Sequence, residues 1–240
     1  MKTFFRACLC AVLISSVAFA RGPKEHRGFY FSAGIGPAYQ SFSSNYTTQN
    51  SRYRWDAYSQ QYDYFYTTEK TENSYDAFVF PAFDFRLGKS IGNLIAIYTT
   101  FDFMFDKGNW EGSYEEHGAD GSVDVSKKVD TENSFMLSGG AGLGFEIYPF
   151  LNPNSVMRGF HIGESSSINM MGVESIGETI DVGEGAFLAN RINVGMDWWV
   201  SETWSLGVEF SYTYFSVIDV DVDEEPERHL FRLMFRLTRG

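Results

Sequence analysis

The chain has 240 residues, which allow one large domain or two small ones. A formal net charge of −12 and the lack of any basic patch exclude nucleic acid as an expected partner. Aromatic residues make up 18% of the chain and there are 23 glycines, a composition that favours strands over helices.

The first twenty residues have the pattern of a secretory signal peptide. A positively charged start precedes an apolar run over residues 7–17 and an A-x-A site that ends at Ala20, so we expect cleavage there. A membrane anchor is the less favoured alternative, because a spanning helix needs about 20 apolar residues. The leader holds Cys8 and Cys10, the only cysteines, so we expect a mature chain without disulfides or thiolate metal sites.

Beyond the leader, apolar and polar residues alternate with a period of two, which is the repeat of a β-strand. The predicted strands cover 28–40, 75–87, 94–106, 134–148, 185–199, 203–215 and 229–238, with a weaker eighth at 155–163. Most are about ten residues or longer, the length of a membrane-spanning strand, whereas strands of soluble proteins cluster near five or six residues.

The connections between these strands alternate in length. Short turns fall at 88–93 and 200–203, and a connection of medium length falls at 150–154. Long polar loops fall near 41–74, 107–133, 164–184 and 216–227. This layout predicts an all-β fold, in which residues 21–240 form a single closed antiparallel up-and-down transmembrane β-barrel of eight strands. We expect the long loops to be extracellular and both termini to be periplasmic.

The two faces of the predicted strands differ in a way that indicates which one faces outward. One face is bulky and apolar, which suits lipid, and the other is rich in small residues that fit a narrow lumen. A soluble barrel of the lipocalin type is the alternative, but it would carry a densely charged exterior. We expect an aromatic girdle at the short-turn end, formed by Tyr148, Trp198, Trp199 and Trp204.

Charged residues collect on the predicted lumen face. They are Asp84, Arg86, Asp102, Glu146, Arg191, Asp197, Glu209, Arg232 and Arg236. Unpaired charges in a packed lumen are costly, so these should pair, with Glu209 beside Arg232 or Arg236. The favoured hypothesis is an ionic plug that fills the barrel, and the alternative is a charged constriction in a narrow pore.

The leader, the opening GFYFSAGIG, the strand and turn GGAGLGFEIYPF and the eight alternating segments resemble small outer-membrane barrels of Gram-negative bacteria. The transmembrane domain of outer membrane protein A is the best-known member, and the resemblance covers nearly all of residues 27–239. It implies outer-membrane lipids, lipopolysaccharide and the barrel-assembly machinery as partners. Such proteins usually end in an aromatic residue, whereas this chain ends at Gly240.

No enzyme signature accompanies this pattern. No serine motif is tied to His117 or His161, and acids at alternate positions near 219–225 lack the glycine of an EF-hand loop. We therefore expect no catalytic residue, no metal and no cofactor. The predicted role is structural or surface-interacting, with the tyrosine-rich first loop as a candidate surface for an extracellular ligand. A passive porin-like channel is the alternative, and a lipid-modifying enzyme is less favoured.

Overall fold

A computed structural model describes residues 28–56, 58, 60–117, 123–152, 154–175, 185–218 and 227–240, so the predicted leader lies outside the described residues. It contains the strands β1 (Gly28–Asp56), β2 (Gln61–Ile91), β3 (Ile95–His117), β4 (Val123–Ile147), β5 (Phe160–Ser175), β6 (Gly185–Trp199), β7 (Trp204–Val217) and β8 (Glu227–Arg239). Among the described residues, no helix is long and apolar enough to cross a membrane.

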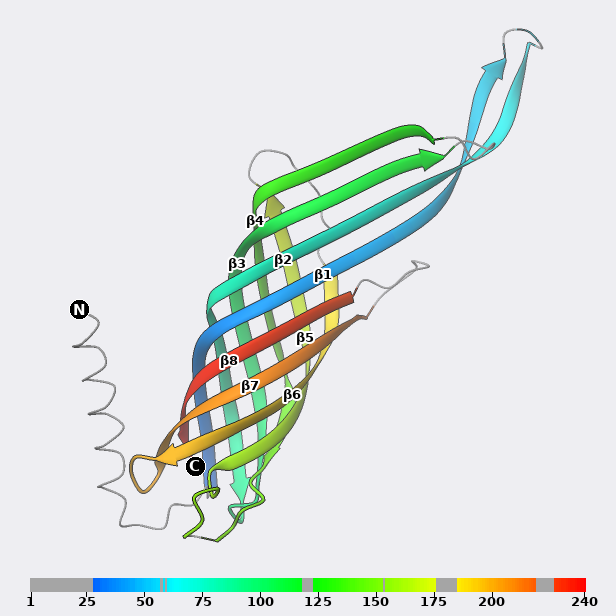
Figure 1. Cartoon of the computed structure of the whole chain (residues 1–240). Helices are drawn as coiled ribbons and strands as arrows, with labels where there is room; N and C mark the ends of the chain where they lie inside the picture. The colour runs from blue at the N-terminus through cyan, green and yellow to red at the C-terminus, as the bar shows by residue number, and fades with distance from the viewer. Residues whose placement is uncertain are drawn as a thin grey trace, which may run out of the picture.

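The eight strands close into one antiparallel barrel (Figure 1). Each strand pairs with its neighbours in chain order, and β8 returns to β1, with Arg239 opposite Phe31. Within the barrel wall, closure leaves no unpaired sheet edge, which is the way a β-protein satisfies its backbone polar groups in lipid. The predicted fold class, a closed up-and-down barrel of eight strands, is confirmed.

The strands are tilted relative to the barrel axis, as one row of paired residues shows. The row runs through Phe29, Lys89, Ile97, Phe145, Glu164, Ile192, Tyr212, Phe231 and Tyr39. It leaves β1 at Phe29 and returns to the same strand at Tyr39, ten residues further on. Such a stagger is what closes a twisted sheet into a barrel, and it fixes the height of every residue in the wall.

The short connections lie together at one end of the barrel. Gly92 and Asn93 both have positive φ, 60° and 57°, as a tight hairpin turn between β2 and β3 requires. Residues 148–159 connect β4 to β5, and residues 200–203 connect β6 to β7. The first residues of β1 and the last of β8 reach the same end, which we call the short-turn end.

At the opposite end, the first four strands are longer than the sequence predicts. Residues 41–74 and 107–133 were expected as loops, but most of them continue the strand ladders, with Thr48 paired to Glu69 and Gly112 to Val129. Backbone pairing needs no apolar face, so polar residues can extend a hairpin that an alternation pattern does not reveal. Figure 1 shows the β1–β2 hairpin reaching furthest beyond the barrel.

The weak strand predicted at 155–163 is also misplaced. Residues 155–159 form hydrogen-bonded turns, and β5 runs from Phe160 to Ser175, through most of the expected loop at 164–184. The reason lies in the outward positions of β5, where Glu164 and Ser166 interrupt an otherwise apolar face and hide its period. Residues 176–184, and residues 219–226 of the last predicted loop, lie outside the described residues.

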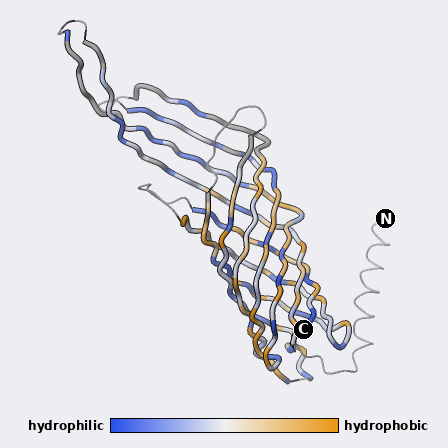
Figure 2. Tube along the Cα trace, turned by 180° about the vertical axis from the view of Figure 1, so that it is seen from behind, coloured by the Kyte–Doolittle hydropathy of each residue, from blue (hydrophilic) through white to orange (hydrophobic). Residues whose placement is uncertain are grey.

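The outer wall of the barrel is a belt of exposed apolar side chains. Phe85, Phe101, Phe145, Phe210 and Leu233 are between 40% and 48% exposed, and all project outward. Figure 2 shows hydrophobic residues concentrated in the barrel wall and hydrophilic ones along the extended hairpins. We call this surface the apolar belt. The inward side chains are mostly buried and fall into a charged layer near the short-turn end and an apolar layer above it.

Candidate functional site

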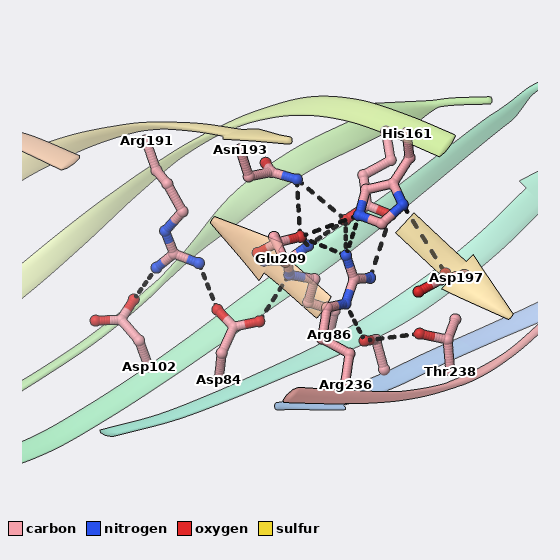
Figure 3. Close-up of polar contacts among 12 residues, drawn as sticks. Asp84, Arg86, Asp102, His161, Arg191, Asn193, Asp197, Glu209, Arg236 and Thr238 are labelled. Carbon is pink, nitrogen blue, oxygen red and sulfur yellow. Dashed lines mark hydrogen bonds and ion pairs between the residues drawn. The ribbon is translucent and has the colours of Figure 1, made fainter. Parts of the chain in front are cut away.

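The nine charged residues predicted to face the lumen all project into the barrel (Figure 3 labels seven of them). Eight are buried, and Asp102 keeps 11% of its side chain exposed. They come from six different strands, because alternate residues of each strand face inward. Five carboxylates face four guanidinium groups, and most of them join one network.

Arg86 on β2 is one centre of this network. Its Nη1 and Nη2 donate to the two carboxylate oxygens of Glu209 at 2.9 and 2.6 Å, a bidentate pair across the barrel. It also donates to Glu146, and its Nε lies 2.7 Å from Oδ1 of Asp84. The guanidinium packs over the Tyr98 ring, 5.2 Å from its centroid. Arginine suits this position because its rigid fork can bind several carboxylates at once.

Arg236 on β8 is the second centre and shares the same two glutamates. It donates to Glu209, and its Nη1 lies 3.1 Å from Oε1 of Glu146. The remaining donors reach the Tyr30 hydroxyl at 2.7 Å and the Ser32 hydroxyl at 3.1 Å. Of the two arginines proposed as neighbours of Glu209, it is thus Arg236 that lies against it.

The glutamates are held by neutral donors as well. Glu146 accepts hydrogen bonds from the hydroxyls of Tyr30 and Tyr148, both at 2.9 Å. Asn193 donates to Glu209 at 2.9 Å. A buried charge pair is tolerated only when its remaining lone pairs are also satisfied, and these three side chains serve that purpose.

Arg191 on β6 links a second pair of acids. It donates to Asp84, and its Nη2 donates to Asp102 at 2.8 Å. Asp84 therefore bridges Arg191 and Arg86 and joins the two halves of the network. Neighbouring strands β2 and β3 bring the two aspartates together, since Asp84 and Asp102 are direct partners in that ladder. Without Arg191 their like charges would repel one another.

His161 and Asp197 extend the network toward the short-turn end. Nδ1 of His161 lies 3.2 Å from the Gly159 carbonyl oxygen, and its Nε2 lies 2.7 Å from Nη1 of Arg236. Asp197 is fully buried, with Oδ2 at 3.9 Å from Nδ1 of His161. The sequence pattern placed His161 on the weak strand and missed its inward position.

Two inward glycines make room for these side chains. A Cβ added at Gly195 would lie 2.5 Å from Nε2 of His161, and one at Gly207 would collide with the Asp197 carboxylate. Real Cβ atoms do not approach other atoms so closely. The glycines on β6 and β7 are therefore needed for the position of the two buried groups.

Arg232 differs from the other arginines of the network. It is 4% exposed, but its Nε has no hydrogen-bond partner and its guanidinium makes no ion pair within 4.0 Å in the part of the chain that the structure describes. It lies between Arg236 and Arg228 on the inward face of β8. Of the four arginines predicted to face the lumen, Arg232 is thus the one that forms no ion pair with a described carboxylate.

A polar group that the sequence pattern missed lies further from the short-turn end. Arg228 donates to Oε1 of Gln40 at 2.8 Å and to Ser138 at 3.0 Å, and its guanidinium lies 4.2 Å from the Phe215 ring centroid. Gln40 in turn donates to Asp106 at 2.5 Å. Arg228 repeats the four-residue spacing of Arg232 and Arg236, so the same signal could have found it.

Apolar side chains surround this second polar group. The inward cluster contains Ala38, Phe42, Tyr75, Ala77, Val79, Ala82, Met104, Met136, Met171, Phe187, Ala189, Phe215 and Leu230, all buried. The lumen-facing side was expected to be rich in small residues, and this layer adds large apolar side chains to it. An eight-stranded barrel is narrow enough for such side chains to fill it.

The four residues predicted to form an aromatic girdle do not all face outward. Trp198 faces outward and is 49% exposed, and Trp204 is partly exposed beside Phe31, with ring centroids 6.3 Å apart. Tyr148 and Trp199 are instead buried, at 1% and 7% exposure, and Tyr148 belongs to the charge network. The alternation pattern could have predicted these inward positions, because residues two apart on a strand face the same side. Tyr148 is two residues from Glu146, and Trp199 is two residues from Asp197.

Glu146, His161 and Glu209 place three potential ligand atoms within 4.8 Å of one another. The arrangement nevertheless does not suit a metal ion, because Arg236 already lies against all three side chains. A guanidinium so close would repel a cation bound to these atoms. The geometry instead resembles a closed salt-bridge network that fixes side chains across the barrel.

No protein-family model and no curated protein matches the sequence. Among solved structures, the outer membrane protein OprG from Pseudomonas aeruginosa is similar at 12% identity and a TM-score of 0.44, over 90% of this chain and 98% of that one. The outer membrane protease OmpT from Escherichia coli is similar at 9% identity and a TM-score of 0.37, over 88% and 96%. At these scores neither likeness assigns a role.

Proposed function

We propose that this protein is a bacterial outer-membrane β-barrel with a structural or surface-interaction role and a lumen closed by its own side chains. The observation that carries the proposal is the apolar belt around a closed barrel. Exposed apolar side chains such as Leu143 at 69% and Phe235 at 58% surround the wall. Soluble monomers rarely expose continuous apolar surface on this scale, whereas lipid requires it.

The interior supports a closed lumen. The charged layer ties β2, β3, β4, β6, β7 and β8 together through Arg86, Arg191 and Arg236, and the apolar cluster fills the barrel beyond it. Two consecutive layers of packed side chains leave little room for a continuous water column. An interior of this width is filled by side chains in other eight-stranded barrels.

The extended hairpins support a role at the cell surface. They rise from the end opposite the short turns, so we assign that end to the outside and both termini to the periplasm, the usual layout of such barrels. The hairpins β1–β2 and β3–β4 offer a long polar sheet for an extracellular ligand. Outer-membrane lipids and lipopolysaccharide would surround the belt, and the barrel-assembly machinery would insert the chain.

A non-catalytic role fits the surroundings of the histidines. His161 is fully buried within the charge network, and His229 stacks on the outward ring of Tyr212, with centroids 6.0 Å apart. His117 lies 3.3 Å from Glu115 on a long hairpin. His229 lies opposite Ser41 in the β1–β8 ladder, but none of the three histidines forms a hydrogen bond with a serine among the described residues. This supports the proposal of a non-catalytic role.

The membrane assignment is tested by expression of the full chain in a Gram-negative host. We expect the protein in the outer-membrane fraction, with a different gel mobility before and after boiling in SDS, because a closed barrel resists the detergent until heated. Recovery in the soluble fraction with identical mobility in both conditions would contradict the assignment.

A second candidate function, a narrow passive channel, is favoured by one observation. Arg232 faces the interior and forms no ion pair with any described residue. An arginine that binds permeating anions in a pore would be placed in the same way. Its position at the junction of the charged and apolar layers would make it a constriction. Steady ion conductance that changes when Arg232 is replaced would favour this candidate over the closed lumen.

A further inference from the structure

One small region of the apolar belt is polar. Glu164 and Ser166 on β5 and Asn190 on β6 face outward and are exposed, and Ser166 donates to Oδ1 of Asn190 at 2.8 Å. We call these three residues the belt polar patch. The residues that flank the patch along the two strands, Ile162, Ile168, Leu188 and Ile192, are apolar and 39% to 62% exposed.

The patch lies at mid-height in the wall. The row of paired residues described above climbs around the barrel from Phe29, near the short-turn end, to Tyr39. Glu164 is the middle member of this row, with four members on each side of it. Its direct partners across the ladders are Phe145 and Ile192, which are both apolar. A glutamate at this height is too far from either membrane surface to reach water easily.

The carboxylate of Glu164 has no charged partner in the part of the chain that the structure describes. It forms no ion pair and no side-chain hydrogen bond with any residue that the structure describes. Charged and polar groups that face lipid near the midplane destabilise a barrel, so an unpaired carboxylate there calls for a partner from outside.

The patch contains both halves of a hydrogen-bonding pair. Glu164 offers acceptors, and because Oδ1 of Asn190 already accepts from Ser166, the amide group of Asn190 is left as a donor. Two copies packed through this wall about a two-fold axis would each present a donor and an acceptor to the other. Such an isologous contact is the commonest form of self-association.

The surface around the patch is hollowed. A hollow of about 320 Å³ lies beside Glu164, lined by Phe145, Ile147, Ile162 and Ile192. Leu143, adjacent to it on β4, protrudes with 69% exposure. In lipid, where apolar burial drives little association, close packing and interfacial hydrogen bonds supply the energy.

We propose that two copies of this chain associate in the membrane through the β5–β6 wall, with Glu164 of each copy accepting a hydrogen bond from Asn190 of the other. This inference rests on the proposed membrane location. The two are tested separately, because the gel mobility of a single barrel reports membrane-type folding regardless of association.

Cysteine cross-linking in native outer membranes tests the contact. In a background with Cys8 and Cys10 replaced by serine, Ile192→Cys places a thiol beside the patch, and Ile35→Cys places one on β1, on the opposite wall of the eight-stranded ring. Both parent side chains are exposed, at 62% and 43%. With a short bismaleimide we expect a product of twice the chain mass from Ile192→Cys and little from Ile35→Cys.

Two substitutions at Glu164 test the hydrogen bond. Glu164→Leu should lower the dimer yield of Ile192→Cys, and in vesicles it should raise the dimer dissociation constant about tenfold, since two equivalent hydrogen bonds are lost. Glu164→Gln keeps an acceptor and should retain the dimer. Unchanged heat-dependent gel mobility of both variants shows that the barrel still folds.

Several results would overturn the proposal. Equal cross-linking at Ile192→Cys and Ile35→Cys would indicate random collision. A Glu164→Leu variant that associates as strongly as the parent would remove the role of the carboxylate. A cross-linked product of another mass would assign the patch to a different protein. If all variants were instead recovered as soluble chains with one gel mobility, the membrane assignment itself would be wrong.

Discussion

Arg236 and Glu209 form an ion pair although they do not face each other in the β7–β8 ladder. Arg236 lies opposite Gly207, and Glu209 lies opposite Met234. The guanidinium extends along the interior and reaches the acid two residues away. From there it also reaches Glu146 on β4, so a single side chain connects three strands of the wall.

Replacement of Arg236 by alanine should destabilise the folded barrel strongly. It would leave Glu146 and Glu209 sharing Arg86 alone, and loss of one member of a buried pair costs about 3–5 kcal/mol. The measurement is reversible urea unfolding in lipid vesicles, followed by tryptophan fluorescence.

Arg239→Ala is the matched control on the same strand. Arg239 is exposed and lies 5.7 Å from the Trp204 ring, so its loss should change the unfolding midpoint little. Equal effects of the two substitutions would show that the interior ion pairs do not hold the barrel together.

The space that Gly195 leaves for His161 gives a second prediction. Gly195→Ala should destabilise the barrel by about 1–3 kcal/mol, because the new methyl group overlaps the imidazole ring. In His161→Ala the overlap with the imidazole ring is gone, and only the close approach to the Val208 carbonyl oxygen, at 2.7 Å, remains. The double variant should therefore lose less stability than the sum of the two single variants. Strict additivity in this double-mutant cycle would mean that the two residues do not touch.

The adjacent tryptophans Trp198 and Trp199 should differ in their contact with lipid. Trp198 is 49% exposed on the belt, whereas Trp199 is 7% exposed on the inward face. In chains that keep only one tryptophan, brominated lipids should quench the fluorescence of Trp198 strongly and that of Trp199 weakly. Similar quenching of both would contradict the assigned faces of β6.

The alternation of residues along the chain was sufficient to predict the barrel and the inward face of most strands. Arg232 and Arg236 lie four residues apart, which is two strand repeats, and both face inward as expected. Strand β6 has the predicted bounds, Gly185–Trp199. These features depend only on the local period of two, which a sequence displays directly.

Features that the alternation did not reveal have separate physical causes. Glu164 and Ser166 broke the apolar period of β5, so most of that strand was expected as a loop. Arg228 was missed because β8 was expected to begin at His229, two residues after its observed start at Glu227. Contacts across the lumen, such as Arg86 to Glu209, depend on the tilt and stagger of the whole barrel, which no local pattern encodes.

The closed lumen is tested most directly by single-channel recording of the folded protein in planar lipid bilayers. The recordings compare the parent chain with Arg232→Ala and Arg236→Ala. If the charged and apolar layers fill the barrel, the parent and Arg232→Ala should show no steady conductance, and any openings should appear only when Arg236→Ala loosens the network. Steady openings of the parent, with a conductance that changes in Arg232→Ala, would contradict the closed lumen and assign the protein to narrow channels.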